Sequence, residues 1–454
     1  MYQYYYDNEL PRPENTGSGK VSTWTIIQEQ KMGKGSFKIT LPKLIMVTAF
    51  GTICLRLLTM FFTMNSCPGY GIIIDAGSSG SRIHIFNWKT NSFLSTLHEI
   101  SKLKLYPGIS SYKTGKEAGD SIVPLLHHGS TIIPPHCWSS TNIHLMATAG
   151  MRLVSETKSI EIFKGIRQTL QESPFQFESE NAGILPGDKE AEYDWLSVNF
   201  ATKAFVPSNN SPFVGVSDLG GASTQISFEV NEADRNKPGV KTIEMNAVQH
   251  SVYGVSRLHM GLYEAFRNTK KLQNSGASSF TSSSSSSPCN IPGDYKQCQL
   301  LVQKYIQKHA QEDMSQLGET AVAPTMKDPE MLFYGLDNFA KLNSIVFILN
   351  RNVKSRELPP EIFVNPDLNR WVDAAQRVCG MRSFRELRSI VPVKAAKDRI
   401  LSSSCFGLIY VKALIEDVYK LKSKRLIFAH SIDDIDGSWA TGASIAVFGN
   451  GKKR

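Results

Sequence analysis

DAGSSGSR, residues 75–82, decides how this chain folds, because it joins two apolar segments through a turn of small and hydroxylated residues. The run that begins at Gly71 is apolar, and the run that ends at Trp88 alternates apolar and polar residues, which indicates a β-hairpin. Glycines let backbone N–H groups approach a bound anion closely, and serine hydroxyls add donors. Asp75 stands at the strand end, where a carboxylate can hold a divalent cation through water. The hairpin therefore predicts a phosphate-binding turn.

A second hairpin of the same design is expected over residues 213–228. An apolar run leads to DLGGASTQ at residues 218–225, and Ile226 and Phe228 then alternate with polar residues. One glycine- and serine-rich turn is a weak signal, since such turns are common in hairpins. Two of them, each with an aspartate at the end of the first strand, predict two related lobes with one phosphate-binding turn each.

The rest of the sequence mixes helical and strand patterns, which predicts an α/β protein. The apolar spacing predicts helices in five segments: 117–128, 156–171, 297–310, 369–379 and 406–422. Short apolar runs predict strands at 143–147 and 443–448. Residues 275–287 are low in complexity and rich in serine, so we expect a flexible surface insertion there.

Residues 44–64, LIMVTAFGTICLRLLTMFFTM, are mostly apolar over a length that can span a bilayer as a helix. Arg56 near the centre costs about 2.5–3.5 kcal/mol on an insertion scale, which the surrounding apolar residues can offset. Lysines precede the segment, whereas residues 65–74 carry no charge, so the positive-inside rule places residues 1–43 in the cytosol. We expect a single-pass type II membrane protein whose signal anchor is followed by a luminal or extracellular part. A buried soluble helix is the alternative.

The formal net charge of +9 could suit nucleic acid, but the basic residues are spread along the chain and no zinc-finger, RRM or KH signature occurs. An anionic small-molecule substrate suits such a surface equally well. The seven cysteines show no spacing typical of structural zinc. In an oxidising compartment the expected disulfides are Cys289–Cys298 and Cys379–Cys405, with reduced thiols as the alternative. The sequon at 209–211 could be glycosylated in a lumen.

The two hairpins resemble those of the actin, Hsp70 and sugar-kinase superfamily. More closely, the chain resembles the apyrases, which are the nucleoside triphosphate diphosphohydrolases of the GDA1/CD39 group. Five segments match the conserved regions of that family in order: 75–86, 146–153, 187–200, 218–228 and 438–443. The resemblance implies two RNase-H-like lobes with a nucleotide cleft between them. Lobe I would span 65–212, with 432–454 able to return to it, and lobe II would span 213–431.

The resemblance also implies a mechanism in which water attacks the terminal phosphate of a nucleoside di- or triphosphate. Glu190 matches the general base of the family, and Ser223 and Gln225 match residues that position the water. Asp75 and Asp218 match the carboxylates that hold Ca²⁺ or Mg²⁺, mostly through water. The other implied binding positions are Gly77, Ser78, Ser79, Arg82, Thr148, Gly220, Gly221 and Ala222. Such a set suits phosphoryl transfer, which needs positioning and charge neutralisation more than covalent help.

The third matched segment departs from the family pattern at two positions. Ala191 replaces the glycine that usually follows the base, and Asp194 replaces a small residue before Trp195. The alanine could displace Glu190, and a second carboxylate could raise its pKa. DNFAK at 337–341 replaces an aromatic-rich stretch of the family, so the preferred base stays open.

Three hypotheses remain. The first is an active nucleotide phosphohydrolase in the Golgi or endoplasmic reticulum, where the single-anchor members of the family favour diphosphates such as UDP and GDP. A cell-surface enzyme that acts on extracellular ATP and ADP is its neighbouring alternative. The second is a membrane protein that binds nucleotide without turnover. The third is a sugar kinase or polyphosphatase. The five segments that match the apyrases in order argue against this hypothesis. We expect neither nucleic acid nor an obligate protein as a partner.

Overall fold

The computed structural model describes most of the chain from Cys67 onward, in the ranges 67–89, 92–274, 287–317, 324–350, 359–433, 435–436 and 438–449. The expected tail at 1–43 and anchor at 44–64 lie outside the described residues, as does the serine-rich insertion apart from Ser287. Over the described ranges, no helix has the length and apolar character that crossing a membrane requires.

The first sheet contains the first predicted hairpin and has the strand order β3-β2-β1-β4-β5. Strands β1 and β2 pair antiparallel with Asp75 opposite Arg82, and β4 runs parallel to β1. The five strands are β1 (Gly69–Ala76), β2 (Ser81–Trp88), β3 (His98–Leu105), β4 (Asn142–Ala147) and β5 (Ala182–Ile184). The hairpin and the strand expected near 143–147 are therefore confirmed.

Both faces of β1 are buried, which explains its continuous apolar run. Ile72 and Ile74 belong to a core with helices α3 (Gly115–Ile132) and α5 (Glu156–Gln171). Ile73 belongs to a different core on the opposite face. Both helices match the predicted helical segments, and side chains cap their first turns: Thr114 forms a capping box with Glu117, and Ser155 accepts a hydrogen bond from Lys158 N.

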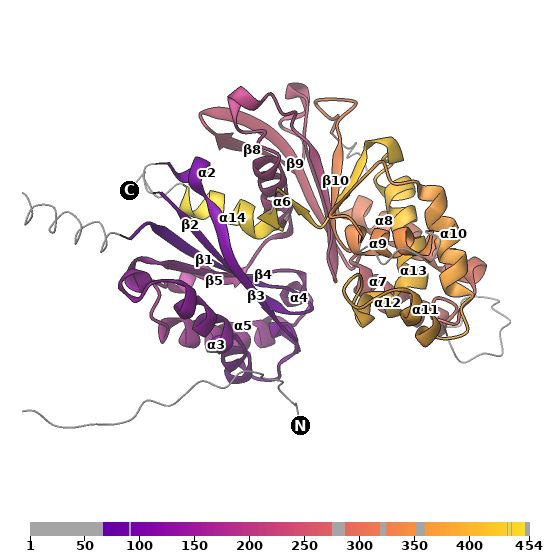
Figure 1. Cartoon of the computed structure of the whole chain (residues 1–454), viewed down its shortest axis with the longest axis horizontal. Helices are drawn as coiled ribbons and strands as arrows, with labels where there is room; N and C mark the ends of the chain where they lie inside the picture. The colour runs from indigo at the N-terminus through magenta and orange to yellow at the C-terminus, as the bar shows by residue number, and fades with distance from the viewer. Residues whose placement is uncertain are drawn as a thin grey trace, which may run out of the picture. The chain divides into compact units, whose positions relative to one another are not determined.

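The second sheet contains the second predicted hairpin and has the strand order β11-β12-β10-β6-β7-β9-β8. Its strands are β6 (Gly215–Leu219), β7 (Ser223–Glu229), β8 (Val240–Met245), β9 (Val248–Leu258), β10 (Phe333–Asp337), β11 (Ile362–Val364) and β12 (Leu426–Ala429). Strands β6 and β7 form the antiparallel hairpin, and β10 and β12 add to it in parallel. Two sheets with helices packed against them confirm the α/β class (Figure 1).

Helices cover the second sheet and share one large apolar core with it. They are α7 (Leu262–Asn274), α8 (Tyr295–Leu317), α9 (Asn338–Leu349), α10 (Leu368–Cys379), α11 (Phe384–Ile390), α12 (Asp398–Ser402) and α13 (Ser404–Ala413). The expected disulfides Cys289–Cys298 and Cys379–Cys405 lie in this helical part and are confirmed. A third disulfide, Cys67–Cys137, links residues 70 positions apart, and the sequence pattern did not indicate it.

Two helices lie between the sheets: α6 (Gly187–Ala201) and α14 (Trp439–Phe448) (Figure 1). Helix α6 packs on β6, β7 and β9, and α14 packs on α6 and β1. The strand expected at 443–448 is wrong, because those residues form the second half of α14. Its first seven residues are all buried, and a helix that is buried all round loses the polar face from which helical periodicity is recognised.

Candidate functional site

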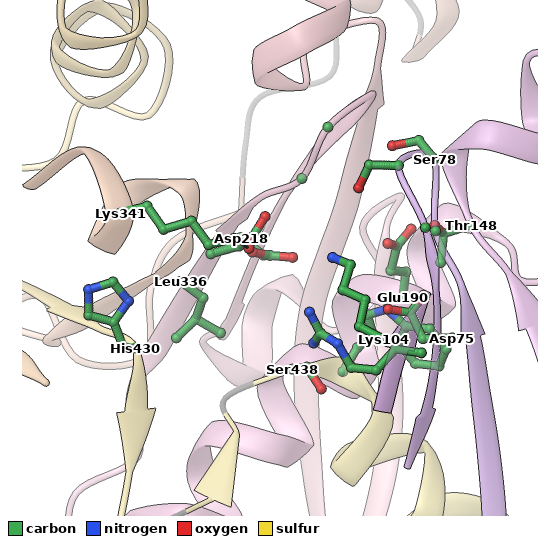
Figure 2. A pocket seen from close by; sticks show the side chains of 18 of the residues that line it. Asp75, Ser78, Lys104, Thr148, Glu190, Asp218, Leu336, Lys341, His430 and Ser438 are labelled. Atoms are coloured by element: carbon green, nitrogen blue, oxygen red, sulfur yellow. Dashed lines mark hydrogen bonds and ion pairs between the residues drawn. The ribbon is translucent and has the colours of Figure 1, made fainter. Parts of the chain in front are cut away.

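The turns of the two predicted hairpins meet at a cavity of about 260 Å³. The lining comes from both sheets and from helices α6, α9 and α14. Figure 2 shows Asp75 and Ser78 on one side of this cavity and Asp218 and Lys341 on the other. A Cβ atom on Gly221 would lie 2.6 Å from Ser78 Oγ. The second turn therefore needs its glycine to come this close to the first.

Most residues that the sequence predicted for the site line this one cavity. They are Asp75, Gly77, Ser78, Ser79, Arg82, Thr148, Glu190, Asp218, Gly220 and Gly221. Three predicted residues are buried close by rather than on the cavity wall: Ala222, Ser223 and Gln225 are 5%, 2% and 1% exposed. The fold thus brings the catalytic, metal and phosphate candidates together around one space.

Glu190 lies in the first turn of α6 and is 5% exposed. It forms an ion pair with Arg152, whose Nη1 donates to Ser256 Oγ at 3.2 Å. Gln225 Nε2 donates to the same Ser256 Oγ at 2.9 Å and to Ser223 Oγ at 2.8 Å. One polar network therefore connects the three predicted catalytic residues through Arg152 and Ser256, for which the sequence analysis predicted no role.

The protonation state of Glu190 is set by opposing effects. Burial raises the pKa of its carboxyl group to about 7, Arg152 lowers it and the negative charge of Asp75 raises it. A carboxyl group whose pKa is near neutrality can accept a proton at physiological pH and release it again. Its position at the cavity wall and this pKa both fit a general base.

Two aspartates at strand ends fit a divalent cation. Asp75 and Asp218 are each the last but one residue of their strands, β1 and β6. Each has a buried carboxylate oxygen, Oδ1, without a hydrogen-bond partner in the described part of the chain. Burial is the largest cause that raises the pKa of each, followed for Asp218 by the charge of Asp337. Carboxylate oxygens are the ligands that Ca²⁺ and Mg²⁺ prefer. A bound cation would satisfy these oxygens and remove the cost of burying them.

Three cationic side chains also reach the cavity: Arg82, Lys104 and Lys341. Lys341 on α9 forms an ion pair with Asp337, the last residue of β10, which immediately precedes the helix. The pKa of Lys104 is lowered, mainly by burial and also by Arg82, so the cavity favours an anion beside it. Sequence reasoning missed Lys104 and Lys341, although Asp337 and Lys341 have the i,i+4 spacing typical of a helical ion pair.

Comparisons with known proteins agree with this geometry. A model of the GDA1/CD39 (nucleoside phosphatase) family matches residues 63–452. Probable apyrase 6 of Arabidopsis thaliana is 26% identical over 96% of this chain and 82% of its own length. Ectonucleoside triphosphate diphosphohydrolase 5 of Gallus gallus is 36% identical over 45% of this chain, and the match spans about half, 51%, of that relative.

The fold likewise resembles a solved structure. The nucleoside triphosphate hydrolase structure from Neospora caninum superposes with a TM-score of 0.57, at 13% identity, over 88% of this chain and 96% of that one. At this identity the likeness concerns the fold alone. The family match covers nearly all described residues, including both hairpin turns and α6. The chain therefore belongs to the GDA1/CD39 (nucleoside phosphatase) family.

Proposed function

We propose that this chain hydrolyses the terminal phosphate of nucleoside di- or triphosphates in a reaction that requires Ca²⁺ or Mg²⁺. The observation that carries the proposal is the meeting of two phosphate-binding turns at a cavity that Glu190 also lines. A cavity with two glycine- and serine-rich turns, three cations and a buried carboxylate base has the parts that phosphoryl transfer requires. The family membership supports the same reading.

In this mechanism the protein mainly positions the reactants. The two turns place glycines and the hydroxyl groups of Ser78 and Ser79 at the cavity wall, and Lys104 and Arg82 neutralise charge on the terminal phosphate. Glu190 takes a proton from water as the water oxygen bonds to the terminal phosphorus and the bridging P–O bond breaks. Gln225 and Ser223 are linked to Glu190 by hydrogen bonds through Ser256 and Arg152, and this network keeps the surroundings of Glu190 ordered. A divalent cation held by Asp75 and Asp218 would supply charge neutralisation and orientation of the phosphates.

The direct test is phosphate release by the purified full-length chain. UDP, GDP, ADP and the matching triphosphates would be offered with Ca²⁺, with Mg²⁺ and with a chelator. We expect phosphate release that depends on the cation. The rates with the different nucleotides then show which base is preferred. Nucleotide binding without phosphate release would favour the alternative, a membrane protein that binds nucleotide without turnover. Transfer of phosphate to a sugar would favour a kinase.

We also propose that the catalytic part faces a lumen or the cell exterior, with the segment at 44–64 as its membrane anchor. Three disulfides support this orientation, because disulfides persist in oxidising compartments. Asn209 of the sequon is exposed and donates a hydrogen bond to Ser211 Oγ, so the acceptor lies at the surface. Protease protection in intact microsomes tests the orientation, since digestion of the catalytic part from the cytosolic side would contradict it.

The ion pair of Glu190 gives a test by pH. The base acts only when deprotonated, so activity is lost as the pH falls through its pKa. Arg152 lowers that pKa, so Arg152→Ala should move the acid limb of kcat/KM upward by about one pH unit. Arg152→Lys keeps the charge and should restore much of the original profile. An unchanged acid limb in the alanine variant would show that Arg152 does not tune Glu190.

A further inference from the structure

Asp194 is a buried carboxylate that the proposed mechanism does not use. It lies one helical turn after Glu190 on α6 and is 1% exposed. Both of its carboxylate oxygens are buried and have no hydrogen-bond partner among the described residues. The charged groups with the strongest effect on it are all carboxylates: Asp218, Glu190, Asp75 and Asp337. Asp194 does not itself line the cavity, but it is close enough to these carboxylates to interact with them electrostatically.

An isolated buried carboxylate is one of the most costly groups in a protein, so such groups are paired or bind a metal. Arg152 binds Glu190 and Ser256, and Lys341 binds Asp337, while the charged groups that act most strongly on Asp194 include no cation. Protonation alone does not satisfy Asp194, because a neutral carboxyl group still needs an acceptor for its O–H and a donor for its C=O. The described part of the chain supplies neither.

Two hydroxyl oxygens, one on α6 and one on the neighbouring α14, are also buried without partners in the ranges that the structure describes. Ser197 Oγ lies three residues after Asp194, on the same face of α6. Thr441 Oγ1 is on α14, whose Gly442 approaches the backbone of Tyr193. A hard cation, together with its water ligands, satisfies many oxygen atoms at once. The unpaired carboxylate oxygens of Asp194, Asp75 and Asp218 are hard oxygen ligands of the kind that such a cation takes.

We propose that Asp194 is a third carboxylate, beside Asp75 and Asp218, that holds the divalent cation directly or through water before any nucleotide binds. Magnesium sites of this kind usually rely on one or two carboxylates plus the phosphates of the substrate. A third carboxylate adds charge and ligand atoms, which favours Ca²⁺ with its six to eight oxygen ligands. The inference shares the site of the proposed function but concerns binding in the absence of substrate.

Calcium binding to the nucleotide-free protein tests this directly. The purified full-length chain would be stripped with a chelator, dialysed and titrated with Ca²⁺ in a calorimeter, with Mn²⁺ binding followed by electron paramagnetic resonance. We expect Asp194→Asn to weaken binding at least tenfold. Asp194→Gly should weaken calcium binding to a similar extent. Small residues are usual at this position in the family, so the glycine variant keeps the test possible if the asparagine variant fails to fold.

Asp188→Asn is the matched control, since this carboxylate lies on the same helix but is half-exposed and 3.7 Å from Lys241. It should change the affinity by less than about twofold, as expected for a weak surface pair. Unchanged calcium affinity in both Asp194 variants would overturn the proposal, as would a wild-type protein that binds calcium only with nucleotide present. If the wild-type protein bound calcium but released no phosphate from any nucleotide, the proposed hydrolysis would be contradicted and this inference would stand.

Discussion

Replacing Glu190 by glutamine is expected to lower the rate of phosphate release by roughly 10²–10⁴-fold, which is the usual contribution of a general base. Glutamine has the same shape and still accepts a hydrogen bond from Arg152, but it cannot take a proton from water. Nucleotide binding should stay close to that of the wild type, because the two turns and the lysines that would contact the phosphates line the cavity independently of this group. Single-turnover phosphate release and equilibrium nucleotide binding measure the two effects separately.

Glu192→Gln is the control for this change. Glu192 lies two residues further on α6, and it pairs with Lys189 at 2.7 Å. Removing this carboxylate should leave phosphate release within about twofold of the wild type, because Glu192 does not line the cavity and its partner Lys189 is half-exposed. A Glu190→Gln variant that retains more than a tenth of the wild-type rate would show that another group accepts the proton, and Asp194 would be the next candidate.

The same substitution has a consequence for stability. The pKa of Glu190 is raised in the folded protein to about 7 from an ordinary value near 4.5, so the folded state binds this proton more tightly than the unfolded state. The resulting stabilisation is complete below the unfolded pKa and is lost as the pH rises through about 7. In a chelator, the wild-type melting temperature should therefore fall more between pH 6.5 and pH 8 than that of Glu190→Gln.

The hairpin turns could be predicted from the sequence because their chemistry is local. Within a few residues, an apolar strand, an aspartate and a run of glycine and serine specify both the turn and its ligand type. The connections around Glu190 are not local. Arg152 and Ser256 are 104 positions apart and meet only because β9 passes α6 and β7 in the folded protein. Sequence spacing carries no signal for such a contact.

The final helix shows a second limit of sequence reasoning. Residues 443–448 have the apolar character of a buried strand, and periodicity alone does not separate a short buried strand from a buried helix. The choice depends on packing: Gly442 lets α14 lie directly against α6. The third disulfide is a similar case, because Cys67 and Cys137 approach only when β1 and the turn at Pro135–Ser140 are in place.

Gly442→Ala should destabilise the folded protein by about 3 kcal/mol, at the upper end of the usual cost of overpacking. A Cβ at this position would lie 1.9 Å from the backbone oxygen of Tyr193, and a backbone atom cannot move aside as the end of a side chain can. The two helices must then separate, and α6 carries Glu190 and Asp194. Denaturant unfolding measures the loss of stability, and phosphate release by the remaining folded protein should fall with it.

Gly183→Ala provides the control, because a Cβ there meets no atom within 4 Å. It adds the same methyl group to a strand of the first sheet, so its unfolding free energy should stay within about 1 kcal/mol of the wild type. If Gly442→Ala were as stable as this control, the contact between α14 and α6 would be loose enough to absorb a methyl group. Helix α14 would then not fix the position of Glu190, and the catalytic geometry would have to depend on the contacts of α6 with β6, β7 and β9 alone.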